Sequence, residues 1–267
     1  MKWAAIFLAA VLISSSLWAG TLTDDFEDGD FDGWRPSRFL FPEHAEWTVE
    51  QGELVFTSKN FCYEGPALGI GDETWSDYEF SAQFSLKRTF SICSGGWMPA
   101  LGLAIDSDVA QTGTMKLKKN QWVGVYLSNQ EPHLRNDGWK TKGCEVWLPP
   151  VYQRGPDRGS FIVEPKKWYT LKIRSFPIGA ITTLYEASVD DTPLCEFELK
   201  TVVKEGKRLN TGGAALYARN AEVRFDNVVI TGENIPDLDM NEFVSELSVS
   251  RPGAKLTTTW GELKVDQ

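Results

Sequence analysis

The chain is poor in the residues and motifs that most often mark hydrolytic catalysis. It contains two histidines among 267 residues, and neither belongs to an H-E-x-x-H zinc motif. It has no G-x-S-x-G sequence, the signature of a serine hydrolase elbow. No Glu is followed by Asp two positions later, so the E-x-D-x-E motif of retaining glucanases is also absent. The sequence therefore gives little support to the common hydrolytic mechanisms.

Long hydrophobic runs are missing from all but the first twenty residues. Residues 3–13 are apolar, follow Lys2, and precede a small-residue segment that ends at Ala19. This pattern predicts a signal peptide over residues 1–19, and the run is too short to indicate a membrane span. We therefore expect an exported protein, secreted, periplasmic or at the cell surface, with no membrane span in the mature chain.

The chain also lacks an excess of basic residues. Its formal net charge is −10, and no basic stripe is visible. A polyanionic partner such as nucleic acid is disfavoured by this balance, whereas neutral glycans or cations suit it better.

Helical periodicity is absent before the C-terminal segment, and short alternating runs recur between Gly, Asp, Asn and Pro clusters. The predicted fold class is all-β, an antiparallel two-sheet sandwich of the jelly-roll kind, because the number of strands exceeds what one flat sheet accommodates. The predicted strands cover residues 53–57, 67–70, 78–86, 101–105, 122–127, 145–148, 168–174, 182–189, 194–199, 214–218 and 223–230.

The domain organisation follows from where this pattern stops. The sandwich is expected over residues 20–236, with a hairpin turn at residues 190–193 and an acidic C-terminal tail over residues 237–267. Residues 90–100 and 129–160 are expected to be long loops. Because these loops hold many aromatic residues, we expect them to be functional rather than disordered.

Four cysteines remain after the signal peptide, an even number that suggests two disulfides in an exported protein. Three pairings are possible. With up-and-down strand order, Cys62, Cys93 and Cys144 fall at one end of the sandwich and Cys195 at the other. This favours a Cys93–Cys144 disulfide. It would rigidify the aromatic loops and, by restricting the entropy of the unfolded chain, stabilise the fold by about 4 kcal/mol.

Several segments in order resemble a known family. These are residues 24–34 (DDFEDGDFDGW), 47–54 (WTVEQGEL), 75–78 (WSDY), 168–172 (WYTLK) and 224–230 (RFDNVVI). Together they are similar to the concanavalin A-like, laminin-G-like β-sandwich family that includes the 3-keto-disaccharide hydrolase (family 16 glycoside hydrolase-like) domains. The resemblance covers residues 21–232 and implies a fold more than an activity, since one fold hosts many functions. We expect core roles for Trp47, Trp75 and Trp168.

The resemblance also implies a structural calcium between the first and last strands, with Asp25 and Asp226 as ligands. The sequence D-x-D-x-D-G over residues 28–33 resembles the start of a calcium loop, but position twelve is Phe39 instead of the Glu of an EF-hand. The alternative is an Asp/Gly-rich turn that caps the first strand.

Carbohydrate recognition needs exposed aromatic rings with polar groups beside them, because sugar C–H faces stack on rings and their hydroxyls require hydrogen bonds. The poly- or oligosaccharide-binding residues predicted on this basis come from the two long loops and from outward strand positions. They are Trp97, Trp122, Tyr126, Trp139, Trp147, Tyr152, Arg154, Tyr217 and Arg219.

Three functions stay open at this level. The first is an exported, lectin-like carbohydrate-binding module. The second is a glycan-processing hydrolase of the 3-keto-disaccharide hydrolase type, in which Asp106 and Glu145 would act as acid and base across a cleft. The third is a structural or adhesive surface domain, in which case the tail would mediate attachment.

Overall fold

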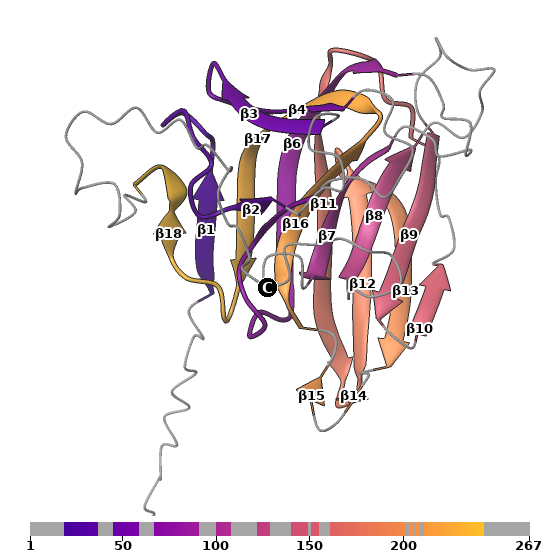
Figure 1. Ribbon diagram of the computed structural model, residues 1–267. Helices are drawn as coiled ribbons and strands as arrows, with labels where there is room; N and C mark the ends of the chain where they lie inside the picture. The colour runs from indigo at the N-terminus through magenta and orange to yellow at the C-terminus, as the bar shows by residue number, and fades with distance from the viewer. Residues whose placement is uncertain are drawn as a thin grey trace, which may run out of the picture.

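The computed structural model describes residues 19–36, 45–58, 67–90, 100–107, 122–128, 140–148, 151–154, 161–200, 203–204, 207–208 and 211–242. They form two facing sheets, which confirms the predicted antiparallel sandwich (Figure 1). The expected signal peptide lies outside these residues. No helix within the described ranges has the length and apolar character needed to cross a membrane.

The nine-stranded sheet has the order β13-β12-β11-β6-β17-β1-β18, and β4 joins β17 and carries β3. Its strands are β1 (Gly20–Asp24), β3 (Ala45–Glu50), β4 (Glu53–Ser58), β6 (Tyr78–Thr89), β11 (Trp168–Gly179), β12 (Thr182–Val189), β13 (Thr192–Lys200), β17 (Ala221–Gly232) and β18 (Leu238–Asp239).

The seven-stranded sheet has the order β10-β9-β8-β7-β16-β5-β2. Its strands are β2 (Arg35–Pro36), β5 (Ala67–Ile70), β7 (Ala100–Ser107), β8 (Trp122–Ser128), β9 (Lys140–Leu148), β10 (Val151–Arg154) and β16 (Gly213–Arg219). A separate hairpin pairs β14 (Val203–Lys204) with β15 (Lys207–Arg208).

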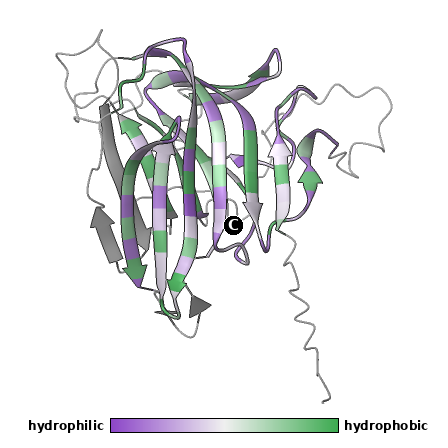
Figure 2. Cartoon of the chain, turned by 180° about the vertical axis from the view of Figure 1, so that it is seen from behind, coloured by the Kyte–Doolittle hydropathy of each residue, from purple (hydrophilic) through white to green (hydrophobic). Residues whose placement is uncertain are grey.

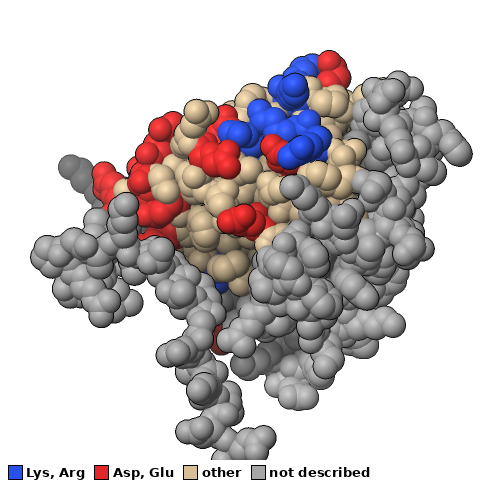
Figure 3. Space-filling model, turned by 45° about the horizontal axis from the view of Figure 1, so that its top comes forward, with Lys and Arg blue, Asp and Glu red and all other residues tan. Residues whose placement is uncertain are grey.

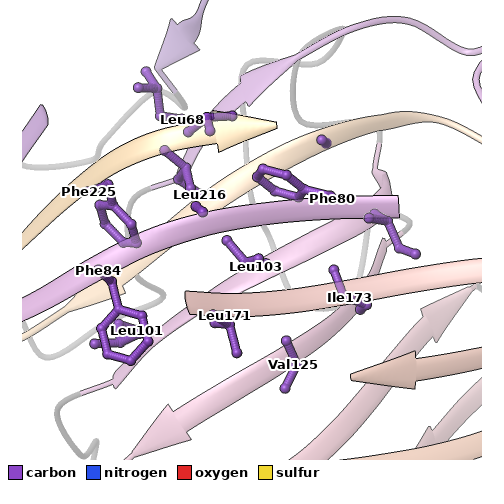
Figure 4. Packing of buried hydrophobic residues seen from close by; sticks show 14 of the residues in the cluster. Leu68, Phe80, Phe84, Leu101, Leu103, Val125, Leu171, Ile173, Leu216 and Phe225 are labelled. Carbon is purple, nitrogen blue, oxygen red and sulfur yellow. The ribbon is translucent and has the colours of Figure 1, made fainter. Parts of the chain in front are cut away.

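Alternation builds the core between the two sheets. In β6, Tyr78, Phe80, Ala82 and Phe84 are buried while the residues between them are partly exposed. Residues of both sheets interdigitate in this layer, as Figure 4 shows for Leu101 and other labelled side chains. Each fully buried large apolar side chain contributes about 1.5–3 kcal/mol, so this layer is the main source of stability.

Every predicted strand is present. The expected turn after β12 is also found: Asp190 and Asp191 both have positive φ, 44° and 60°, as a two-residue type I′ hairpin turn requires. The expected loop at residues 129–160 contains β9 and β10. Trp47 and Trp75 are buried, in keeping with core roles, whereas Trp168 is half-buried.

The sandwich continues past the expected boundary at residue 236. Strand β18 pairs in parallel with β1, Leu238 lying opposite Leu22, and the following 3-10 turn (Met240–Glu242) buries Met240 in the core. Apolar residues within this acidic segment anchor it to the domain. Residues 238–242, which were predicted to belong to the tail, are therefore part of the sandwich domain.

Cys195 lies in the core and is disulfide-bonded, and no described cysteine is free. Cys93 lies outside the described residues, so the Cys93–Cys144 pairing stays a prediction.

Candidate binding face of the seven-stranded sheet

The seven-stranded sheet has one face toward the core and one face away from it, here called the outer face. Leu101, Leu103 and Ile105 of β7 belong to the main core. The positions between them belong to the outer face, where Ala67, Ala100, Ala104, Ala215 and Tyr217 form a second, smaller buried cluster with Tyr126 packed against it. The middle of this face is thus floored by small residues.

Two tyrosines stand on this floor in one cross-strand row. Tyr126 of β8 and Tyr217 of β16 both lie opposite Gly102 of β7, and their rings meet edge to face with centroids 5.0 Å apart. A Cβ on Gly102 would lie 2.8 Å from the Tyr126 ring and 2.1 Å from the Val125 carbonyl oxygen. Glycine is therefore required at this position for the ring to lie over the sheet.

A second row brings three more aromatic positions together. Trp122 of β8 lies opposite Trp147 of β9, which in turn lies opposite Tyr152 of β10. Trp122 alternates with Val123, which faces the core. The register therefore assigns all three positions to the outer face.

Charged positions flank these rows. Arg219 lies opposite Ala100, and Arg154 lies opposite Glu145, itself opposite Gly124. Arg219 is half-buried. By the same alternation, all three charged positions belong to the outer face.

The structure thus brings seven of the nine predicted binding residues to one face: Trp122, Tyr126, Trp147, Tyr152, Arg154, Tyr217 and Arg219. Trp97 and Trp139 lie outside the described residues. Sequence reasoning overlooked two positions of the same face, Arg35, which lies opposite Gly69, and Lys140, which lies opposite Ser128. Arg35 belongs to a two-residue strand, which leaves no periodic pattern to detect.

Access to the face is uneven. Ala67, Ala104 and Ala215 are fully buried and Tyr217 is 6% exposed, so the centre of the floor is closed to solvent. Tyr126 and Arg219 are half-buried, and Arg35 is exposed. A ligand would reach the face through these more open positions.

Asp106 does not join this face, contrary to the prediction that it would act with Glu145 as acid and base across a cleft. It has a positive φ of 50°, at a register irregularity where β7 pairs with β16. This β-bulge turns its carboxyl group into the sandwich, where the side chain is 1% exposed. Since the Asp106 carboxyl group is buried in the sandwich, it does not face an open cleft as the predicted acid–base pair requires.

Instead, Asp106 is part of a polar network between the sheets. The Tyr185 hydroxyl of β12 donates to its Oδ2 at 2.6 Å, and the Asp106 N–H donates to the Tyr78 hydroxyl at 3.1 Å. Tyr78 in turn donates to the Gly213 carbonyl at 2.8 Å. Burial raises the pKa of Tyr78 well above its usual value, and the nearby Asp106 carboxylate adds to this rise. The network holds the bulge in place and offers no accessible catalytic group.

The predicted calcium ligands, Asp25 and Asp226, lie near Glu27 and Glu53 on the nine-stranded sheet. This group of acidic residues is here called the acidic edge. β1 and β17 pair antiparallel, so Asp25 and Asp226 come close. Burial raises the pKa of Asp226, and the charges of Asp25, Glu53 and Glu27 raise it further. Among the described residues, however, no group of three or more His, Cys, Asp or Glu could hold a metal. Two carboxylates supply a minority of the six to eight oxygens that calcium prefers.

The carboxylates of the D-x-D-x-D-G segment bind their own backbone. Asp28 Oδ1 accepts the Asp30 N–H at 3.2 Å, and Asp30 Oδ1 accepts the Asp32 N–H at 2.8 Å. Asp24 and Asp25 make the same contact with the residue two positions on. This is the geometry of successive Asx turns, the alternative to a calcium loop. The calcium site therefore stays a prediction, and at present these carboxylates hold backbone N–H groups.

A shallow hollow of about 350 Å³ lies on the opposite side of the molecule, over β6, β11, β12 and β13. Lys172 pairs with Glu79 at 3.3 Å across its wall, and Arg174 pairs with Glu186. These charged side chains already hold partners from neighbouring strands. The hollow therefore presents a paired, solvated surface instead of a set of groups awaiting a ligand.

Comparison with known proteins adds to the fold but not to the activity. No family model matches the chain, and no curated protein matches it. Among solved structures, the chain is similar to the alginate lyase Aly36B in complex with an alginate trisaccharide, with a TM-score of 0.50, 8% identity, and coverage of 79% of this chain and 97% of that one. It is also similar to a structure from work on endo-acting O-glycanases of the human gut microbiota, with a TM-score of 0.50, 10% identity, and coverage of 78% and 97%. These likenesses show a shared β-sandwich.

Proposed function

We propose that this protein is a lectin-like carbohydrate-binding module that uses the outer face of the seven-stranded sheet. The observation that carries the proposal is the register, which gathers five aromatic positions of four strands, Trp122, Tyr126, Trp147, Tyr152 and Tyr217, on one face. Aromatic rings supply rigid stacking surfaces for sugar C–H groups, and polar groups beside them orient the hydroxyls.

The second candidate, a glycan-processing hydrolase, has less support. Its acid–base pair required Asp106, whose carboxyl group lies inside the sandwich and accepts a hydrogen bond from Tyr185. Both neighbours described above are named for activity on glycans, but at this identity they speak only for the fold. Binding without turnover is the function that the residues of the face support best.

Export and calcium are parts of the same proposal. The N-terminal apolar segment with its small-residue end supports secretion, periplasmic location or cell-surface display. Calcium would act at the acidic edge through Asp25 and Asp226, on the other sheet from the binding rows, and would stabilise the domain instead of contacting the sugar. Chelation should then lower the melting temperature and leave the sugar specificity unchanged.

The test is a glycan-array screen of residues 20–267, followed by affinity measurement and product analysis on every hit. Tyr126→Ala should weaken binding at least tenfold. It removes the half-buried ring, which is the more exposed of the two tyrosine rings in the row of Tyr126 and Tyr217. Phe176→Ala is the matched control, because Phe176 is a half-buried aromatic on the outer side of the other sheet. Equal losses in both variants, or no retained glycan, would overturn the proposal. Released products would favour the hydrolase.

A further inference from the structure

The charged positions of the outer face have a different balance from the chain as a whole. The chain carries a formal net charge of −10. Among the described residues, the charged positions that the regular register assigns to the outer face are Arg35, Lys140, Arg154 and Arg219 on the basic side and Glu145 on the acidic side. An acidic protein thus collects a local basic excess on the face that also collects its aromatic positions.

The acidic residues gather elsewhere. Asp25, Glu27 and Glu53 lie close enough to Asp226 at the acidic edge to raise its pKa. Figure 3 shows acidic side chains concentrated toward one side of the end of the molecule that it views, while the Lys and Arg side chains of this end have acidic neighbours. The net charge of the chain therefore does not describe the outer face, where the register gives four basic positions and one acidic position.

The basic positions surround the aromatic rows. Lys140, Ser128, Ala100 and Arg219 form one cross-strand row directly beside the row of Tyr126 and Tyr217. Three strand spacings separate the two ends of the row, about 14 Å. Arg154 and Arg35 occupy opposite edges of the sheet, in the next row on the other side of the tyrosines. A chain of sugars lying over the rings would have basic positions of the sheet on both sides.

We propose that the ligand of this face is an acidic oligosaccharide, one that carries carboxylate or sulfate groups on its sugar rings. The inference rests on the proposed carbohydrate-binding function and names its substrate class. It reverses the expectation of a neutral glycan, which follows from the net charge alone. The planar fork of an arginine matches a carboxylate or sulfate in two hydrogen bonds, which an uncharged hydroxyl cannot accept with the same strength.

Screening decides which charges act on the ligand. At physiological ionic strength the Debye length is about 8 Å, so exposed charges separated by more than this are largely screened. The acidic edge lies on the other sheet, whereas Arg219 lies in the row beside Tyr126. The local basic positions should therefore outweigh the repulsion of the net charge. Raising the salt to 1 M, where the Debye length is about 3 Å, should weaken binding.

The experiment compares an acidic oligosaccharide with its uncharged ester and with a second oligosaccharide that carries sulfate groups. The probes are a hexamer of galacturonic acid, its fully methyl-esterified counterpart and a sulfated galactan oligosaccharide of similar length. The free acid or the sulfated probe should bind at least tenfold more tightly than the methyl ester, and the stronger of the two identifies the acidic group. Binding of that probe should fall at least tenfold between 0.15 M and 1 M salt.

Variants test the residues. Arg219→Gln should weaken binding of the acidic probe about tenfold and leave any binding of the methyl ester within twofold. Arg219→Lys should retain part of the affinity, and Glu145→Gln should increase it two- to threefold. Arg174→Gln, which changes an arginine on the outer side of the other sheet, is the matched control and should have no effect. Melting curves establish that each variant is folded.

The outcomes separate this inference from the function on which it rests. If neither the free acid nor the sulfated probe binds more tightly than the methyl ester, the acidic ligand is overturned and carbohydrate binding stays intact. The same holds if only neutral glycans are retained on the array. Retention of no glycan at all would overturn both. If Arg219→Gln does not fold, the ligand comparison and the salt dependence of the unmodified protein still decide.

Discussion

The outer sides of the two sheets share one alternating pattern and use it differently. On the nine-stranded sheet, large polar side chains point outward and pair with each other, as Lys172 does with Glu79 and Arg174 with Glu186. Figure 2 shows this sheet from behind, with hydrophilic and hydrophobic residues alternating along its strands. On the seven-stranded sheet the central outward positions are Gly and Ala, and aromatic rings lie over them. The first side pairs its charges across neighbouring strands, while the second places aromatic rings over small residues.

A covalent link between the sheets would have the largest effect on this comparison. Cys195 faces the core from β13, β9 lies near β13, and Cys144 of β9 lies opposite the core-facing Val125. In place of the Cys93–Cys144 pairing that the sequence suggested, we expect a Cys144–Cys195 disulfide, which closes a loop of about 50 residues and stabilises the fold by about 4 kcal/mol. Cys195→Ser should lower the free energy of unfolding by this amount. A non-reduced peptide map that joins Cys144 to Cys93 would contradict this pairing.

The small residues of the outer face, Gly102 among them, should give the next largest difference between the two sheets. Gly102→Ala should destabilise the fold by about 3 kcal/mol, because the added Cβ would overlap the Val125 carbonyl and crowd the Tyr126 ring. Gly179→Ala on the other sheet is the control, since no atom lies within 4 Å of its added Cβ. Denaturant unfolding of both variants measures the difference. Similar stabilities for the two variants would mean that the floor is not closely packed.

The polar network between the sheets comes third. Tyr185→Phe should cost about 2–3 kcal/mol, since it removes the hydroxyl that donates to the buried Asp106 carboxyl group. Tyr169→Phe should cost about 1 kcal/mol, because the Tyr169 hydroxyl accepts one backbone N–H, that of Glu164, in a partly exposed place. Chemical denaturation measures both losses, and a larger loss for Tyr169→Phe than for Tyr185→Phe would contradict this expectation.

The acidic edge should make stability depend on pH. Burial raises the pKa of Asp24 to about 6, although the Trp34 Nε1–H and the Phe26 N–H both donate to its carboxylate. The folded state then binds more protons than the unfolded state between about pH 4 and 6. The free energy of unfolding should therefore fall as pH rises through this window, by about 2 kcal/mol from this group.

Replacement of Asp24 isolates its share of that pH dependence. Asp24→Asn should remove most of the fall in the free energy of unfolding between pH 4 and 7, measured by denaturant unfolding at each pH. The raised pKa values of Asp32 and Asp226 act in the same direction and should remain visible in the variant. If the free energy of unfolding depends on pH in the same way in the variant, Asp24 is not the main source of the pH dependence.

The smallest effect is expected for the ion pairs of the nine-stranded sheet. Arg174→Ala should cost about 0.5 kcal/mol, because the pair with Glu186 is exposed to solvent and screened by salt. Thermal melting at low and high salt measures it. A loss above about 2 kcal/mol would show that this side is more than a solvated surface.

Strand alternation carried most of the fold prediction. The run from Tyr78 to Leu86 has one apolar and one polar face in the sequence, and β6 buries the expected face. Among the strands that were not predicted, β2 and β18 have two residues each, and their pairing partners, β5 and β1, come from elsewhere in the chain. Short strands lack enough periods to be recognised, so their place depends on the neighbours they meet.

The candidate site was predicted less completely, and Asp106 shows why. Strict alternation along β7 places it beside Ala104 on the outer face. One extra residue opposite β16 reverses its direction and buries it with Tyr185. Nothing within β7 itself marks this bulge, because it arises from pairing with a strand more than a hundred residues later.

The sequence by itself determined the all-β class, the apolar layer and the supply of aromatic residues, since these follow from composition and from a period of two. The tertiary structure alone decided which outward positions become neighbours. It placed Trp122 beside Trp147, and Arg219 in the row next to Tyr126. The physical reason is that register and bulges depend on backbone hydrogen bonds between distant segments, and a shift of one residue would move each side chain to the other face.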